Sequence, residues 1–424
     1  MPTILKNATF IDSNSFEFKK TNIIVSENKN IIFENNVSLI DKYPNATIIN
    51  CEGKFVTKSF ACGHHHVYSA LARGMGAPKK QPENFYEVLQ YIWWTLDKCL
   101  DLEIIEASAL ATAIACAKNG VTFAIDHHAS PFSVEGSLET IARAFDKVGV
   151  SHLLCYEISN RDGDEIAEKG LAETENYLKT HQGLVGLHAS FTVNEKTLIS
   201  AVNLANKYNS GLHIHVAEDN YDQKHCLENY NKRVVERLFD KGVLNSSKTI
   251  LGHCLHLNDN EKEIISKSPV WVVQNTDSNL NNNVGYFNAA GLGDNIFLGT
   301  DGMHSDMLKS MKSAFFVGQG FDNINFSSAY QRLRNVNKYI SQNEFSGDDE
   351  NNLVVFDYDT PTEMNSDNFL GHLIFGLESK HVNHVISNGK LIVKDKEILT
   401  INEAESLDFA KEMGKKLWAE MKKN

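Results

Sequence analysis

The sequence predicts an α/β fold, a (β/α)8 TIM-like barrel with a small β-sandwich domain built from both chain ends. Short apolar runs alternate with longer amphipathic segments between residues 55 and 345, and repeated strand–helix units predict a parallel sheet covered by helices. Almost every run ends in a polar or ionisable residue. Barrel enzymes place their active sites at the carboxyl ends of the strands, so this regularity favours a closed barrel.

Eight apolar runs supply the expected barrel strands, which matches the strand number of a (β/α)8 barrel. The segments that contain them are 55–66, 121–128, 151–158, 184–190, 212–218, 249–256, 270–277 and 296–302. Amphipathic stretches such as EIIEASALATAIACAKNG lie between most of these runs, and their period is typical of helices that cover one face of a sheet.

The two chain ends have a different texture. Residues 1–54 and 346–401 contain short alternating runs that are broken by Asn, Asp and Gly, which predicts strands joined by turns. Asn388-Gly389 is a strong hairpin signal. We therefore assign 1–54 and 346–401 to one composite β-sandwich, 55–345 to the barrel, and 402–424 to an exposed C-terminal helix.

Composition and charge exclude several classes of protein. The chain has 424 residues and a net charge of −13, and such a surface repels nucleic acid and anionic membranes. The seven cysteines are odd in number and form no CxxC pair, which is typical of reduced thiols in a cytoplasmic protein. We see no signal peptide and no apolar run of membrane-spanning length. Base rates alone predict a homodimer.

The first candidate site is the tripeptide His64-His65-His66 at the end of the first run. Residues i and i+2 of a strand share a face, so His64 and His66 point together and His65 points away. Two imidazoles on one inward face can bind a metal such as zinc. The alternative is a polar turn or a patch that binds metal adventitiously.

The second candidate is HIHVAED, where His215 ends a run and Glu218 follows in the next loop. A histidine ligand beside a carboxylate can serve metal-bound water and its proton. Taken alone, Glu218 is also typical of the first turn of a helix, where the dipole favours a carboxylate. His213 shares the face of His215 one layer deeper, and we interpret it as a hydrogen-bonded core residue.

Two further strand ends carry His253 and Asp301. His253 could polarise the group under attack or receive a proton. Asp301, in LGTDG, could bind the metal and accept a proton from water, although a helix N-cap is the common role of such a residue. His256 follows in the loop after His253, and we assign it no role.

Together these motifs resemble the amidohydrolase superfamily over nearly the whole chain, within its deaminase and chlorohydrolase branch. The family pattern is HxH, then HxxE, then His and finally Asp at successive strand ends, which here gives His64/His66, His215 with Glu218, His253 and Asp301. The resemblance implies that His64, His66, His215 and Asp301 bind the metal. It also implies that Glu218 moves protons to the leaving nitrogen and that His253 orients and polarises the substrate.

The resemblance further implies one divalent metal ion. Binuclear relatives carry a carboxylated lysine after the fourth strand, but the segment LVGLHAS has none, which makes His188 a candidate substrate contact. Three histidines and one aspartate suit Zn²⁺ best, with Fe²⁺ and Mn²⁺ as alternatives.

The expected substrate is a small molecule, a purine or a purine-derived heterocycle, as the resemblance implies. Its candidate contacts are His188, Arg73, Trp94 and Gln274, and Tyr68 and Trp93 could also stack on a flat ring. Loss of an exocyclic nitrogen would make the enzyme a deaminase, and loss of a ring nitrogen would make it a cyclic amidohydrolase. A non-catalytic member of the fold is a further alternative. A metal peptidase is disfavoured because the chain contains no HExxH motif.

Overall fold

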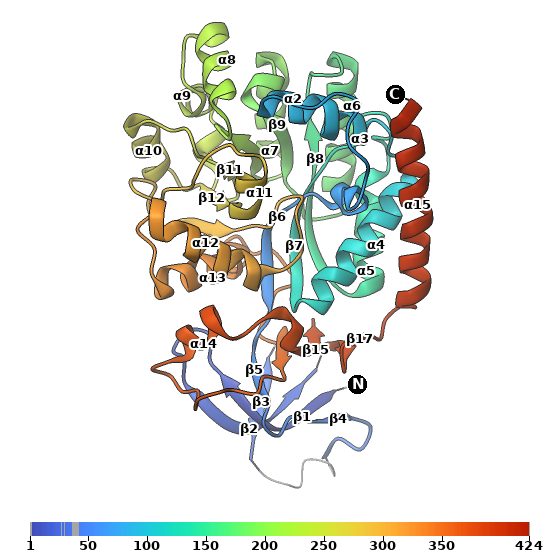
Figure 1. Cartoon of the computed structure of the whole chain (residues 1–424), viewed down its shortest axis with the longest axis vertical. Coiled ribbons are helices and arrows are strands. Elements are labelled where there is room, and N and C mark those ends of the chain that lie inside the picture. Colours follow the sequence, from blue (N-terminus) through green and yellow to red (C-terminus); the bar gives the residue numbers. More distant parts are fainter. Residues whose placement is uncertain (1, 27, 29, 36–41, 424) are drawn as a thin grey trace.

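The computed structural model describes residues 2–26, 28, 30–35 and 42–423. It consists of a barrel with surrounding helices and, below it in Figure 1, a separate sheet formed by the two chain ends. The predicted fold class is confirmed. No helix among these described residues is both long and apolar enough to cross a membrane.

The barrel contains one parallel strand for each apolar run of the sequence. In sheet order the strands are β6 (Phe60–His65), β7 (Val121–His128), β8 (Ser151–Ile158), β9 (Val185–Ala189), β10 (Leu212–Val216), β11 (Ile250–His253), β12 (Trp271–Gln274) and β13 (Ile296–Leu298). The backbone N–H groups of Thr300 and Asp301 both donate to the carbonyl of His64 at 3.0 Å. These bonds join the end of β13 to β6, so the barrel closes where the predicted metal ligands meet.

Helices follow the barrel strands and cover the barrel from outside (Figure 1). They are α4 (Leu102–Lys118), α5 (Ser137–Val148), α6 (Asp164–Leu178), α7 (Glu195–Lys207), α8 (Asn220–Tyr230), α9 (Val234–Asp240), α10 (Asp259–Ser266), α11 (Thr276–Asn281), α12 (Met307–Phe321) and α13 (Phe326–Gln342). Asp101, Asn194 and Asn258 each accept a hydrogen bond from a backbone N–H in the first turn of the helix that follows. These side chains satisfy donors that have no partner inside the helix.

The connection after β6 is longer than the others and lies across the strand-end side of the barrel. It contains the 3-10 helix η1 (Val67–Ala72), α2 (Phe85–Val88), the π-helix η2 (Leu89–Trp93) and α3 (Trp94–Asp97). Figure 1 shows α2 above the barrel. Shorter 3-10 turns are η3 (Ser190–Thr192), η4 (Val243–Asn245) and η5 (Ser379–His381).

The lower part of the barrel interior is filled with apolar side chains. Phe297 stacks on Trp271 at 5.6 Å between ring centroids, and Tyr339 of α13 contacts both rings. Trp271 is 1 % exposed. The barrel is therefore a packed core below and an open site only at its strand-end face.

Strands from both chain ends form one hydrogen-bonded sheet. They are β1 (Thr3–Ile11), β2 (Phe18–Val25), β3 (Ile31–Glu34), β4 (Thr47–Asn50), β5 (Phe55–Lys58), β14 (Leu353–Phe356), β15 (Val382–Ser387), β16 (Lys390–Lys394) and β17 (Glu397–Ile398), and α14 (Phe369–Phe375) lies beside them. At the predicted hairpin both Asn388 and Gly389 have positive φ, as a two-residue type I′ turn requires.

One predicted boundary needs correction. The sequence interpretation placed residues 55–58 in the barrel, but β5 pairs with β1 and β14 of the terminal sheet. Ser59 alone separates β5 from β6, so no loop in the sequence marks the change of sheet. We propose that the barrel begins after Lys58, at the turn into β6.

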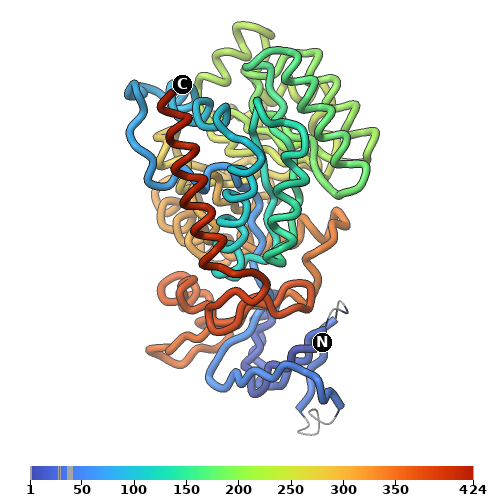
Figure 2. Tube along the Cα trace, turned by 90° about the vertical axis from the view of Figure 1, so that its right-hand side faces the viewer, coloured from blue at the N-terminus to red at the C-terminus, as the bar shows by residue number. Residues whose placement is uncertain are grey.

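The C-terminal helix α15 (Glu403–Lys423) packs along α4 and runs the length of the barrel, as Figures 1 and 2 show. We expected an exposed helix, but one face is buried through Ala410, Met413, Gly414 and Leu417. Trp418 donates from Nε1 to the carbonyl of Leu71 at 2.8 Å. The helix therefore supports the connection that leads from the HxH motif.

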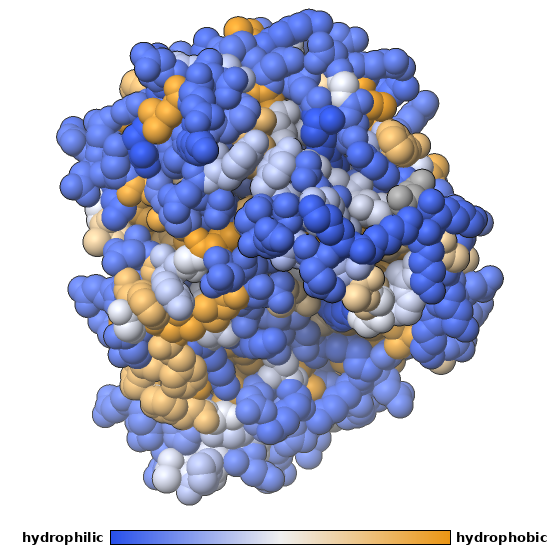
Figure 3. Space-filling model, turned by 45° about the horizontal axis from the view of Figure 1, so that its top comes forward, coloured by the Kyte–Doolittle hydropathy of each residue, from blue (hydrophilic) through white to orange (hydrophobic). Residues whose placement is uncertain are grey.

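The strand-end side of the barrel is turned toward the viewer in Figure 3, where most of the surface is hydrophilic and hydrophobic areas are separate. The large apolar side chains lie mainly in the barrel, under the helices and in the terminal sheet. This distribution is that of a globular domain with its own core.

Gly63 tests how tightly the barrel closes. A methyl group on Gly63 would lie 2.7 Å from the carbonyl oxygen of Leu298 in β13. We expect Gly63→Ala to lower the free energy of unfolding by about 1–3 kcal/mol, because backbone must move to admit the methyl group. Denaturant unfolding measures the loss. Gly76→Ala is the control, since nothing lies within 4 Å of its added methyl group. Equal stability of the two variants would contradict tight closure.

Candidate metal centre and active site

Four predicted ligand groups meet at the mouth of the barrel. Nε2 of His66 lies 3.1 Å from Oδ1 of Asp301 and 3.2 Å from Nε2 of His215, and Nε2 of His64 lies 3.8 Å from the same Asp301 oxygen. Tetrahedral ligands at about 2.1 Å from an ion lie roughly 3.4 Å apart. The spacing therefore matches donors that share one cation.

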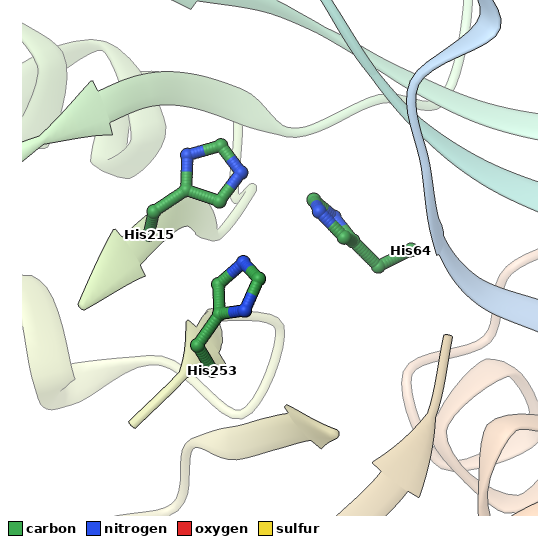
Figure 4. A group of neighbouring side chains, drawn as sticks. All are labelled: His64, His215 and His253. Atoms are coloured by element: carbon green, nitrogen blue, oxygen red, sulfur yellow. The ribbon is translucent and has the colours of Figure 1, made fainter. Parts of the chain in front are cut away.

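Figure 4 shows the rings of His64, His215 and His253 converging from different strands on a common space. His64 belongs to β6, His215 to β10 and His253 to β11. Their ligand nitrogens lie within 4.8 Å of one another. His65 points away, as the strand period predicts, and its Nε2 lies 3.0 Å from Oγ of Ser305.

Hydrogen bonds at the opposite ring nitrogens fix the orientation of the histidines. Nδ1 of His66 donates to the carbonyl of His127 at 2.7 Å, and Nδ1 of His215 donates to the carbonyl of His188 at 2.8 Å. Each ring consequently directs the lone pair of Nε2 into the site, an arrangement typical of metal-binding histidines. Nδ1 of His64 shares a hydrogen bond of 2.9 Å with His213, the buried histidine expected one layer deeper.

Burial determines the charge of these rings. It holds the pKa of His64 and His215 well below the ordinary value, so both imidazoles are neutral near pH 7. Burial has the largest single effect on His66 and lowers its pKa. The hydrogen bond and charge of Asp301, with the charges of Glu157 and Asp126, together outweigh burial and raise the pKa to about 9. A positive charge is thus favoured between His66 and Asp301, and a metal ion can supply it in place of a proton.

One nitrogen that could bind a metal, Nε2 of His64, is buried without a hydrogen-bond partner among the described residues. Nε2 of His64 faces the cluster and accepts no hydrogen bond within the described part of the chain. An unpaired buried polar atom is costly, and a divalent ion would satisfy it. The donor set of imidazole nitrogens and one carboxylate suits a divalent metal.

Glu218 and His253 lie on the other side of Asp301. Nε2 of His253 is 3.5 Å from Oε2 of Glu218 and 3.5 Å from Oδ2 of Asp301. Burial is the main cause that raises the pKa of Glu218 to about 7, with the nearby Asp301 adding to it and His253 opposing it. A carboxyl group with this pKa can carry a proton at neutral pH.

The helix N-cap alternative for Asp301 is wrong, and Glu218 lies before the N-cap of α8 and outside its first turn. Asp219 is the N-cap of α8, and its side chain accepts from the backbone of Tyr221. Asp306 is the N-cap of α12 and accepts from Lys309. The caps are therefore separate residues, and Glu218 and Asp301 remain directed into the cavity that they line.

The backbone at the strand ends is held in an uncommon conformation. His253, Cys254 and Asp301 have φ values of 64°, 55° and 53°, in the left-handed region that residues other than glycine seldom adopt. Such strain persists only where the surroundings enforce it, and it is frequent at active sites. Here it turns His253 and Asp301 toward a common point.

Asn279 is a site residue that the sequence interpretation missed. Its Oδ1 accepts from Nδ1 of His253 at 2.8 Å, which directs Nε2 of His253 toward Glu218 and Asp301. Asn279 lies in α11, directly after the apolar run that forms β12. The sequence feature that could have indicated it is the polar segment directly after barrel strand β12.

The cavity beside the cluster contains two of the four predicted substrate contacts. His188 and Trp94 line it together with Tyr68 and Trp93, whereas Arg73 is exposed and does not. Gln274 is buried in a separate network, in which its Oε1 accepts from Arg332 at 2.8 Å. The structure thus does not bring Arg73 and Gln274 to the cavity.

Two other charged residues occupy the cavity wall instead. Glu157 is the next-to-last residue of β8 and Arg161 follows four residues later, and both line the cavity. The signal for Glu157 was its place at a strand end in SHLLCYEI, equivalent to that of the histidines in other units. Arg161 lies in the loop beyond, where periodicity gives no information.

Comparison with known proteins gives the same picture. The 5′-deoxyadenosine deaminase of Methanocaldococcus jannaschii is 26% identical over 398 residues, which cover 88% of this chain and 91% of the relative. The 5-methylthioadenosine/S-adenosylhomocysteine deaminase of Bacillus cereus is 24% identical over 434 residues, covering 95% and 96%.

Solved structures agree in fold. An adenosine deaminase from Xanthomonas campestris with bound zinc superimposes with a TM-score of 0.80 at 16% identity, covering 97% of this chain and 98% of the other. Guanine deaminase of E. coli has a TM-score of 0.75 at 16% identity, covering 93% and 99%.

The family model for the amidohydrolase family matches residues 55–333. This match spans more than half of the chain and contains all eight barrel strands. It also includes the histidines, the glutamate and the aspartate that converge at the barrel mouth. The chain belongs to the amidohydrolase family.

Proposed function

We propose that this protein is a metal-dependent aminohydrolase that releases ammonia from a purine or a related N-heterocycle. The observation that supports it best is the placement of Glu218, whose buried carboxyl group lies beside His253 at the edge of the ligand cluster. The deaminase names of the relatives favour loss of an exocyclic nitrogen over ring opening. A homodimer and a cytoplasmic location stay predictions of the sequence.

We assign His64, His66, His215 and Asp301 as metal ligands. Three neutral nitrogens and one carboxylate form the donor set that zinc prefers, so zinc is the proposed ion. When bound, the ion supplies a Lewis acid that lowers the pKa of water toward about 7. The buried surroundings of the four ligands exclude bulk water and strengthen every charge interaction with the substrate.

The remaining groups move protons and hold the substrate. Oδ2 of Asp301 and Nε2 of His253 face the same space and can accept the proton of the attacking water. Glu218, with a pKa of about 7, keeps a proton that it can give to the departing nitrogen. Trp93 and Trp94 line the wall against which a flat ring would lie.

Removal of one ligand tests the metal assignment. We expect His215→Ala to reduce bound metal from about one ion per chain to background and to abolish ammonia release, because three remaining donors bind the ion too weakly. Elemental analysis of the purified protein measures the metal. His181→Ala is the control, since His181 is partly exposed and contacts Glu139, Thr180 and Tyr177, none of which belongs to the ligand cluster. Full metal content in His215→Ala would refute the assignment.

Glu218→Gln tests the proton carrier. The amide keeps the size of the side chain but cannot carry the proton, so we expect kcat to fall about 10²–10⁴-fold with metal content unchanged. Steady-state ammonia release on a panel of purines measures the effect. Glu228→Gln removes the same charge from an exposed position of α8 and should leave kcat unaltered. Near-normal turnover of Glu218→Gln would exclude this role.

Asn279→Leu tests the positioning of His253. The leucine side chain cannot accept from Nδ1 of His253, so the ring loses its fixed orientation. We expect kcat to fall about 10–100-fold, the usual cost of losing a group that orients a site residue, while KM and metal content change little. Asn279→Asp retains the acceptor oxygen and should recover most of the activity. A similar loss in both variants would point to a packing role instead.

A further inference from the structure

Arg161 is the only lysine or arginine among the described residues that line the substrate cavity. Its side chain is 8 % exposed, so its guanidinium group is largely removed from water. A buried cation beside a binding site commonly recognises an acidic group of the ligand. The neighbours of Arg161 determine whether it is available for this purpose.

Carboxylates of the protein already surround this guanidinium group. Nη2 of Arg161 pairs with Oδ2 of Asp97, and Nε lies 3.1 Å from Oδ2 of Asp162. Nη1 lies 4.0 Å from Oε1 of Glu157. Three acidic side chains therefore share one arginine, and each nitrogen of the guanidinium group faces one of them.

The other charged groups near Arg161 do not make its surroundings positive. Asp162 also pairs with Lys98 at 2.7 Å, and Glu157 lies 3.2 Å from Nδ1 of His127. Asp97 is 1 % exposed, and its Oδ1 has no hydrogen-bond partner among the described residues. Burial is the main cause that raises the pKa of Asp97 to about 6, against the opposing effect of Arg161.

The face of the guanidinium group is occupied as well. Its central carbon lies 5.1 Å from the ring centroid of Trp94, a cation–π contact. Besides Arg161 and the proposed metal ligands, the ionisable side chains on the cavity wall include the carboxyl groups of Glu157 and Glu218. An acidic group of a ligand would thus meet carboxylates and find Arg161 already paired.

We propose that Asp97 neutralises Arg161 and so restricts the cavity to purine compounds that carry no phosphate or carboxylate group. This inference rests on the proposed function and narrows it to uncharged bases and nucleosides. Asp97 acts here as a specificity residue through Arg161, since it does not itself line the cavity. Like charges placed together at a binding site reject a ligand strongly.

Pairs of substrates that differ in one acidic group test the proposal. Ammonia release by the metal-loaded enzyme is measured with adenosine and guanosine and with their 5′-monophosphates. We expect kcat/KM for each acidic compound to be at least about 100-fold below that of its neutral partner. Equal or better turnover of the acidic compounds would overturn the proposal.

Variants separate the role of Asp97 from general damage to the fold. Asp97→Asn removes one of the negative charges that neutralise Arg161. We therefore expect the ratio of kcat/KM for the acidic compound to kcat/KM for its neutral partner to rise about tenfold. The ratio is informative even if both rates fall. Asp146→Asn, which removes an exposed carboxylate elsewhere, should leave the ratio unchanged. An unchanged ratio in Asp97→Asn would also overturn the proposal.

Arg161→Gln tests the alternative that Arg161 binds an acidic group of the substrate. If Arg161 served as an anion-binding group, this variant would lose turnover of the acidic compounds selectively, and that result would refute our inference. We expect no selective loss. Release of ammonia from none of the compounds by the metal-loaded enzyme would instead overturn the proposed function, and the inference with it.

Discussion

The structure depends on one electrostatic constraint at the barrel mouth, where buried imidazole nitrogens and a carboxylate converge. His66 and His215 direct their Nε2 atoms toward each other at 3.2 Å because backbone carbonyls hold their opposite nitrogens. Buried polar atoms in such an arrangement are costly unless a cation satisfies them. The carbonyls that impose it belong to β7 and β9, so the barrel itself fixes the ring orientations. The packing of the barrel strands therefore also sets the geometry of the candidate metal centre.

Much of this site could be predicted from the sequence because periodicity carries the information. A strand alternates its faces, so His64 and His66 had to share a direction, and a parallel barrel brings equivalent strand ends together. The contacts of residues in loops could not be predicted in this way. Arg73 and Arg161 both follow apolar runs, and only the three-dimensional path of the chain places Arg161 on the cavity wall. Asn279 was missed because its role consists of a single hydrogen bond to His253.

The same reasoning explains the two differences in domain organisation. Only Ser59 lies between β5 and β6, and the hydrogen-bond partners distinguish the terminal sheet from the barrel. In the C-terminal helix, alanine and glycine provide much of the buried face. Small residues contribute little to an apolar periodicity. Lysine and glutamate therefore dominate the sequence pattern of this helix, and that pattern predicts an exposed helix. Packing against α4 nevertheless buries Leu417 completely.

Charge is distributed on two scales that have different consequences. The net charge of −13 keeps the surface acidic and governs long-range encounters, which salt screens over about 10 Å. Around Arg161 the charges are buried, and their balance is set by contacts of single residues. In this low-dielectric region a carboxylate such as Asp97 affects binding far more than a surface carboxylate does. The substrate preference of the cavity thus follows from how its one arginine is paired, and the overall acidity of the chain does not determine it.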